Sequence, residues 1–227
     1  AQVLADQFGP LPAGVSAACP PLGDRQTEPR ALFRRARTQR ASLRLIHKAC
    51  SYADPRLHAV LIASEILGGG VTSRLFARLR ERDGLVYDVS SGATLYSDCG
   101  WVDIATTTSP RHVEATIAAT LEEIRRLADE GVNDGYLQMI KDRAACQMEI
   151  LEDSPMDVAE WFAVREVLFA PDRLTSPTEE AARLESVTAA DVQRVVQEVF
   201  VPASRSLLLV GPSSWGVRRR LRALAAR

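Results

Sequence analysis

Two alternating segments joined by a short turn constrain the fold of this chain most. The stretch from Leu85 to Thr107 contains LVYDVSSGATLYS and WVDIATTT, with residues 98–100 as a turn between them. Strand-forming residues on both sides of such a turn are typical of a β-hairpin. An earlier stretch, ASLRLIHKAC, also alternates and places Leu43 and Leu45 on one face. We therefore expect a largely antiparallel sheet.

Helical patterns fill most of the remaining chain. Apolar residues recur at helical spacing after five capping signals, namely Asp54-Pro55, Thr72 or Ser73, Ser109-Pro110, Asn133-Asp134 and the capping box Thr188-x-x-Asp191. Two further helices are expected at 155–169 and 177–187. Two more strands are also expected: ALFRRAR before the alternating segments, and the buried SRSLLLVGP near the end of the chain. This order predicts an α+β fold, an antiparallel or mixed sheet with helices packed on one face.

Three segments are expected along the chain. Residues 1–28 end in a Pro/Gly-rich stretch and read as the tail of a preceding domain plus a linker. Residues 29–213 would form one domain, for which 227 residues with 46% hydrophobic content leave ample core. Residues 214–227, WGVRRRLRALAAR and its preceding serine, form a basic tail. We expect a solvated terminal helix there, with a membrane-surface helix as the alternative.

Charge and cysteine usage exclude several classes of protein. The 28 basic and 29 acidic residues nearly cancel, so no global field favours nucleic acid as a partner. No apolar run approaches the roughly 20 residues of a transmembrane segment. Cys19, Cys50, Cys99 and Cys146 are too scattered for a disulfide framework and are expected to pack as small apolar residues. We expect a soluble bacterial protein of the cytoplasm or periplasm.

The three glycines Gly68, Gly69 and Gly70 raise the question of a phosphate-binding loop. A Walker loop would continue with Lys and Ser/Thr, whereas Val71 follows here, and a dinucleotide fingerprint would follow a strand rather than a helix. Glycine ends helices and permits close backbone approach. These glycines are therefore expected to form a structural turn, as is Gly84 after the next helix.

Metal and nucleophile patterns are incomplete. His47, His58 and His112 are the only histidines, and none has a second histidine within a helical turn. His47, on the apolar face of a strand, is expected to be a buried, hydrogen-bonded residue, and the other two to be interfacial or exposed. No Gly-x-Ser-x-Gly elbow is present. We expect no metal site and no complete catalytic set in this chain.

Arg80 and Tyr87 are the remaining candidates. Arg80 lies near the end of one expected helix and Tyr87 at the start of the next strand, so the turn at Gly84 could aim both side chains at one point. A guanidinium and a phenol that converge suit a peptide carbonyl or an oxyanion. The alternative is a surface arginine and a core tyrosine without a shared role.

The segment ILGGGVTSRLFARLRERDGLVYDVSS, with YSDCGWVDIATTTSPRHVEATIAATLEEIRRLADEGVNDGYLQMIKD and ESVTAADVQRVVQEVFVPASRSLLLVGP, resembles the pitrilysin/insulinase family of zinc metallopeptidases, the inverzincins. The resemblance runs from about Leu32 to Pro212. Members consist of two similar halves that enclose a chamber, and the first half carries a His-x-x-Glu-His motif. His58 and Glu65, seven apart on the corresponding helix, do not reproduce it. The chain therefore resembles the second, non-metal-binding half.

The resemblance implies a role for the candidate pair. In the family, the second half lends an arginine and a tyrosine, seven residues apart, to the active site of the first, and these match Arg80 and Tyr87. It implies peptide hydrolysis with zinc in a homologous catalytic half, fused upstream or separate, and no activity of this chain alone. The alternatives are a non-catalytic structural or docking subunit of a processing or membrane-associated complex, and a stand-alone zinc enzyme.

Overall fold

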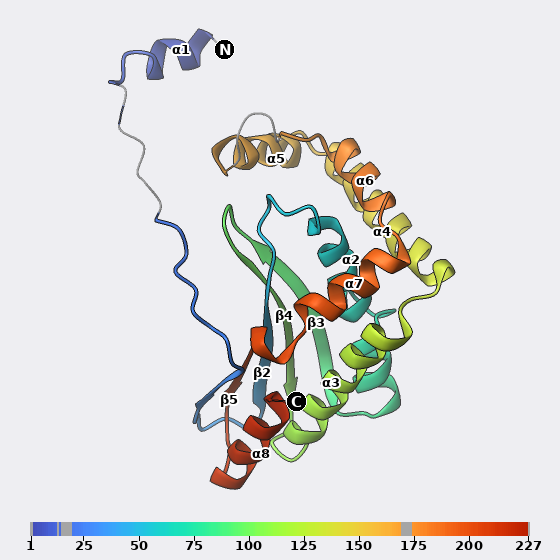
Figure 1. Ribbon diagram of the computed structural model, residues 1–227. Coiled ribbons are helices and arrows are strands. Elements are labelled where there is room, and N and C mark those ends of the chain that lie inside the picture. The colour runs from blue at the N-terminus through green and yellow to red at the C-terminus, as the bar shows by residue number, and fades with distance from the viewer. Residues whose placement is uncertain (1, 13, 15–19, 169–173, 227) are drawn as a thin grey trace.

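The computed structural model describes residues 2–12, 14, 20–168 and 174–226 of the chain. Its centre is a five-stranded sheet in the order β1-β5-β2-β4-β3 (Figure 1). The strands are β1 (Arg30–Arg34), β2 (Ala41–Ala49), β3 (Val86–Leu95), β4 (Gly100–Thr108) and β5 (Arg205–Val210). β1 pairs in parallel with β5, and the other neighbours are antiparallel. The expected mixed α+β fold is confirmed.

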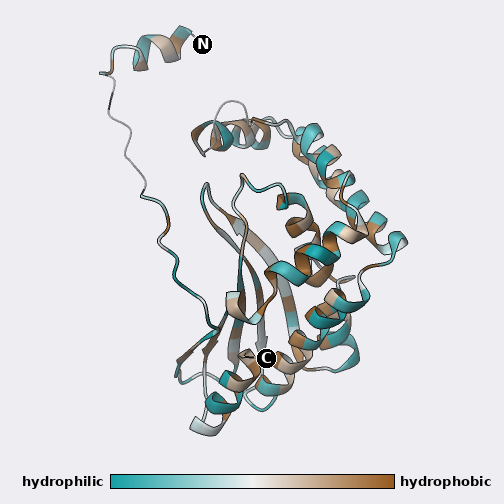
Figure 2. Ribbon diagram, viewed as in Figure 1, coloured by the Kyte–Doolittle hydropathy of each residue, from teal (hydrophilic) through white to brown (hydrophobic). Residues whose placement is uncertain are grey.

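One face of the sheet carries the core. On β2, Leu43, Leu45 and His47 are buried, whereas Arg44 between them is exposed. The buried face is covered by α2 (Leu57–Gly68), α3 (Val113–Glu130), α7 (Ala189–Val199) and α8 (Trp215–Ala225), as Figure 1 shows. Burial of apolar area between these layers is the main stabilising contribution. Figure 2 shows how strongly apolar α2 is, as expected for a helix at the centre of the core.

A second group of helices packs on this layer. α4 (Asp134–Glu152) contacts α2, and both α5 (Pro155–Leu168) and α6 (Pro177–Glu185) contact α4. The 3-10 helix η3 (Pro202–Ser204) leads into β5. The side chains of α1 (Gln2–Phe8) whose burial the structure describes are exposed, including Val3 at 73% and Phe8 at 62%.

Side-chain caps explain why several helices begin where the sequence predicts. The Asn133 side chain accepts the Tyr136 N–H at the start of α4, and Thr188 and Asp191 form a capping box at α7. The hairpin turn is also confirmed, because the Tyr96 N–H donates to the Cys99 carbonyl at 2.7 Å.

Two expected helix starts are wrong by a few residues. α2 begins at Leu57, because the Asp54 carboxylate accepts the N–H and the guanidinium of Arg56 in a turn that precedes the helix. α3 begins at Val113, after a turn in which His112 N–H donates to the Ser109 carbonyl. A side-chain bond competes with helix formation at Asp54, and a backbone turn precedes the helix at Ser109.

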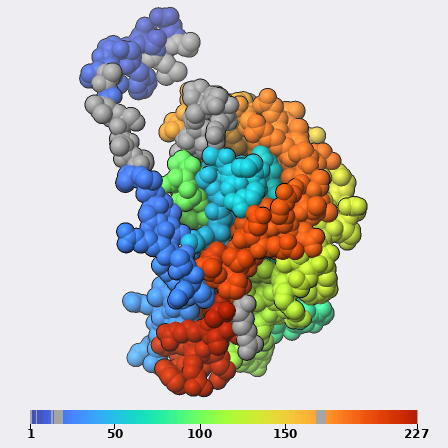
Figure 3. Space-filling view, viewed as in Figure 1, coloured from blue at the N-terminus to red at the C-terminus, as the bar shows by residue number. Residues whose placement is uncertain are grey.

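Residues 20–28 and helix α8 are bound to the sheet domain. The expectation of a solvated C-terminal helix is wrong, because Leu221 and Ala225 of α8 are buried in the core. Between residues 20 and 28, Asp24 pairs with Lys48 at 2.5 Å, and the Gln26 side chain donates to the Arg205 carbonyl at 2.8 Å. This segment runs along one side of the body (Figure 3).

The cysteines differ from one another in exposure. Cys50 is buried, as expected, but Cys99 is half-buried and Cys146 is exposed, so the expectation of packed apolar thiols is wrong for Cys146. Cys146 lies on α4, away from the buried residues Leu137, Ile140 and Ala144 of that helix. Cys19 lies outside the described residues.

Candidate functional site

The helix that carries Arg80 is a π-helix. This element, η1 (Phe76–Arg82), follows a turn in which Ser73 Oγ accepts the Phe76 N–H at 3.4 Å. Its wide winding is seen at its end, where Asp83 N–H donates to the Arg78 carbonyl five residues back. Leu79 is fully buried and fixes the helix against the core. Single π turns occur frequently at functional sites, because they re-aim side chains.

A reversal at Gly84 connects η1 to β3. Gly84 has a φ of 59°, in the left-handed region that glycine tolerates best. The Leu85 N–H then donates to the Leu79 carbonyl at 2.8 Å, which closes the turn. A register irregularity between Val86 and Asp88 places Tyr87 at a bulge of the edge strand.

This turn brings Arg80 and Tyr87 together, as the spacing predicts. Arg80 Nη1 donates a hydrogen bond to the Tyr87 carbonyl oxygen at 2.5 Å. Its guanidinium carbon lies 4.6 Å from the centre of the Tyr87 ring and 5.1 Å from that of Phe76. At these distances, cation–π attraction holds the half-buried Arg80 guanidinium against the Tyr87 and Phe76 rings. The Tyr87 side chain remains 70% exposed.

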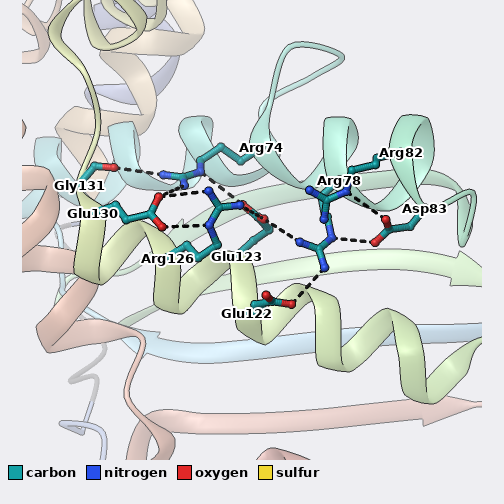
Figure 4. A network of polar contacts seen from close by, with 9 residues as sticks. All are labelled: Arg74, Arg78, Arg82, Asp83, Glu122, Glu123, Arg126, Glu130 and Gly131. Atoms are coloured by element: carbon teal, nitrogen blue, oxygen red, sulfur yellow. Dashed lines mark hydrogen bonds and ion pairs between the residues drawn. The ribbon is translucent and has the colours of Figure 1, made fainter.

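The other arginines of this region are all engaged by carboxylates. Arg78 pairs with Asp83 at 2.7 Å, Glu122 at 3.1 Å and Glu123 at 3.5 Å (Figure 4). These partners raise the pKa of Arg78, and the Arg78 guanidinium lowers the pKa of Asp83. Arg82 also pairs with Asp83. η1 is thereby fixed to α3 by charge-assisted contacts.

Glu123 is the centre of this network. Its side chain is only 5% exposed, and it lies within 3.5 Å of guanidinium nitrogens of Arg74, Arg78 and Arg126 (Figure 4). Sequence reasoning missed this residue. The available signal was its position on α3, three residues after Thr120 and four before Leu127, both of which belong to the apolar stripe.

Arg80 differs from these neighbours. Among the residues that the structure describes, no carboxylate lies within ion-pair distance of Arg80, and the Tyr87 hydroxyl has no hydrogen-bond partner. A cavity of about 480 Å³ on the open face of the sheet is lined by Tyr87, Arg44 and Ser90. Tyr87 thus lies at the edge of a surface hollow, and both Arg80 and Tyr87 have unused donors.

The glycines before η1 shape the end of α2. A Cβ added to Gly68 would lie 2.4 Å from the Ser91 backbone nitrogen, so α2 approaches β3 as only glycine allows. Gly69 follows as the C-cap residue, whose N–H donates to the Glu65 carbonyl at 2.9 Å, and Gly70 has a φ of 124°. Glu65 itself pairs with Arg143 at 2.6 Å.

The buried His47 and the partly exposed His58 have different partners. His47 is fully buried and accepts the Arg205 Nε–H at 3.1 Å, while its Nδ1 has no partner among the described residues. The expectation of a hydrogen-bonded buried histidine is therefore met at one nitrogen only. Burial, and then Arg205, lower its pKa to about 3. His58 contacts Glu180 at 3.1 Å. Within the described ranges, no three His, Cys, Asp or Glu side chains are grouped to hold a metal ion.

Comparison with known proteins assigns the family. The model of a family described as the peptidase M16 inactive domain matches residues 1–144, a range that includes Arg80 and Tyr87. The chain belongs to this family. The resemblance to the non-metal-binding half of the pitrilysin/insulinase peptidases is thereby confirmed.

Individual relatives of this M16 inactive domain agree. An uncharacterized zinc protease of Streptomyces coelicolor is 28% identical over 188 residues, which cover 78% of this chain and 38% of that protein. A protease structure from Helicobacter pylori superposes with a TM-score of 0.83 at 19% identity, over 93% of this chain and 52% of that one. A peptidase M16 inactive domain from Pseudomonas fluorescens gives 0.81 at 21% identity, over 94% and 50%.

The curated relatives are longer than this chain. The chain spans only about two fifths of the curated relatives that it matches first, 38% and 42% of their lengths. The Helicobacter pylori and Pseudomonas fluorescens structures, at 19% and 21% identity, show that this chain shares their fold. In the described part of the chain, no helix combines the length and the apolar character needed to cross a bilayer.

Proposed function

We propose that this M16 inactive domain is the substrate-binding half of a zinc metalloendopeptidase, and that Arg80 and Tyr87 complete the active site of a homologous catalytic half. The observation that carries the proposal is the Arg80–Tyr87 contact at 2.5 Å, in an element whose other arginines are neutralised by carboxylates. An unpaired guanidinium beside an exposed phenol is suited to an incoming peptide carbonyl.

The division of labour follows from the side chains present. The described residues offer no set of metal ligands, so zinc and the general base would belong to the catalytic half. The Arg80 fork would orient the substrate, since its Nη1 is fixed by Tyr87 and its remaining N–H groups face no described carboxylate. The Tyr87 hydroxyl would donate to the oxygen that becomes negatively charged during hydrolysis.

The rigidity of η1 supports this role. A donor stabilises a developing charge best when it is already in place before the reaction. The Arg78 contacts to Glu122 and Glu123 tie η1 to α3, and Leu79 anchors it in the core. Arg80 is thus presented by an element that is fixed on two sides.

The test combines this chain with its His-x-x-Glu-His half, located from the gene region upstream of Ala1 or from a neighbouring gene. Peptide cleavage should require both halves, and Arg80→Ala and Tyr87→Phe should each lower it by about tenfold or more, since one oxyanion donor typically contributes at least that factor. If the assembly cleaves peptides and neither variant loses activity, the pair has no such role. An assembly without activity would favour the docking-subunit alternative.

A further inference from the structure

A second cavity lies between the start of α2, the end of α5 and α6, away from η1 and β3. Its volume is about 260 Å³, and its walls include His58, Arg165, Thr175, Glu180 and Arg183. The Trp161 Nε1–H donates to the Thr175 carbonyl at 2.8 Å, and this bond joins α5 to the segment that precedes α6. The cavity is therefore built by contacts between elements rather than by one loop.

Its negative side is already partnered. Glu180 is buried and contacts His58 Nε2 at 3.1 Å with one oxygen, while Thr175 Oγ1 donates to the other at 3.5 Å. Burial opposes ionisation of Glu180, yet its pKa is lowered because His58, Arg165 and Arg183 all favour the charged form. Glu180 thus contributes one partly neutralised charge.

The two arginines on its positive side have no carboxylate partner within ion-pair distance among the described residues. Arg165 is half-buried and lies with its guanidinium carbon 3.1 Å from the centre of the Trp161 ring. Neither Arg165 nor Arg183 forms a hydrogen bond or ion pair through its guanidinium with any residue in the described ranges. Burial lowers the pKa of Arg165, which reflects the cost of withdrawing its charge from water.

Two other arginines of this chain that are not exposed, Arg205 and Arg78, have the hydrogen-bond acceptors that the Arg165 guanidinium lacks among the described residues. Arg205 donates to His47 and to the Ala225 carbonyl, and Arg78 contacts three carboxylates. A half-buried guanidinium with unused donors is costly unless an acceptor completes it. A planar anion that enters the cavity would supply that acceptor, because carboxylates match the guanidinium fork.

We propose that the cavity between α2, α5 and α6 binds a single carboxylate group, held by Arg165 and, at the rim, by Arg183. The Glu180 carboxylate in the same cavity repels a second negative charge, so a monoanion is favoured over a phosphate dianion. About 260 Å³ is below the usual range for drug-sized ligands and admits a small acid or the end of a peptide. The inference does not rest on the role of Arg80 and Tyr87.

The test follows the Trp161 indole N–H resonance of the ¹⁵N-labelled chain, because this group donates to the carbonyl of Thr175 in the cavity wall and its ring lies against Arg165. The probes are acetate, N-acetyl-alanyl-alanine with a free carboxylate, the same peptide as an amide, and inorganic phosphate. We expect a saturable shift with at least one of the two carboxylates and none with the amide. Saturation by acetate alone identifies a small acid as the ligand, and saturation by the peptide acid identifies a peptide C-terminus.

Arg165→Gln is compared with Arg219→Gln as a matched control. Arg219 also stacks on a tryptophan, Trp215 at 5.3 Å, but it is exposed and outside the cavity. Arg165→Gln should weaken carboxylate binding at least tenfold and Arg219→Gln should leave it unchanged. If Arg165→Gln does not fold, Arg183→Gln should still weaken binding severalfold. Equal shifts with acid and amide, tighter binding of phosphate, or no saturable shift would each overturn the proposal.

Discussion

Arg78 and Arg80, two residues apart on η1, have different kinds of partner. Arg78 is surrounded by carboxylates of Asp83, Glu122 and Glu123, whereas Arg80 contacts the carbonyl oxygen and the ring of Tyr87. The first arginine holds the element in place, and the second keeps donors free. This division underlies the function proposed for the chain.

Replacing Glu123 tests the anchoring network. Glu123→Gln keeps the size of the side chain but removes a buried charge that three arginines share, so we expect the free energy of unfolding to fall by about 1–3 kcal/mol. Urea denaturation measures it. The control is Glu114→Gln, whose ion pair with Arg220 has side chains 33% and 56% exposed and should cost less than about 1 kcal/mol. Equal losses in both variants would show that Glu123 is not an anchor.

Gly68→Ala tests the close approach of α2 to β3. The added Cβ would lie 2.4 Å from the Ser91 nitrogen, and backbone must move to accept it. We expect a loss of about 1–3 kcal/mol in the free energy of unfolding, as is typical of overpacking. At Gly23 an added Cβ meets nothing within 4 Å, so Gly23→Ala serves as the control. A thermal melt of Gly68→Ala that matches the control would contradict the packing described here.

The lowered pKa of His47 should make the stability of the fold sensitive to acid. Its pKa is about 3 in the folded chain, against 6.5 ordinarily, so between these values the unfolded chain binds the extra proton. The contribution of neutral His47 to the free energy of unfolding is therefore fully present above pH 6.5. It is lost progressively as the pH falls from 6.5 towards 3. Between pH 7 and pH 5 the parent should lose about 2 kcal/mol more than His47→Gln, measured by urea denaturation at both values. Identical pH dependence in the two proteins would show that His47 is not the cause.

Much of the fold follows from local signals in the sequence. The caps Asn133 and Thr188, the turn at Gly84 and the alternation along β2 act through neighbours in the chain, and each produced the expected element. The Arg80–Tyr87 contact could be anticipated for the same reason, because only a short turn separates the two residues.

Features that depend on distant partners could not be read in this way. The pattern of α8 shows an apolar stripe but not that Leu221 would be covered. Glu123 owes its role to arginines 45 and 49 residues earlier in the chain, and Glu180 meets His58 across 122 residues. The π winding of η1 likewise has no signature in the residues themselves.

The most direct test of the proposed function is the ratio of kcat/KM for peptide cleavage between Arg80→Ala and Arg82→Ala, each assembled with the catalytic half. Both variants remove one arginine from η1, but Arg82 is paired with the Asp83 carboxylate, whereas Arg80 has no carboxylate partner among the described residues. We predict a loss of about tenfold or more for Arg80→Ala and little change for Arg82→Ala. Equal values for the two variants would contradict the account.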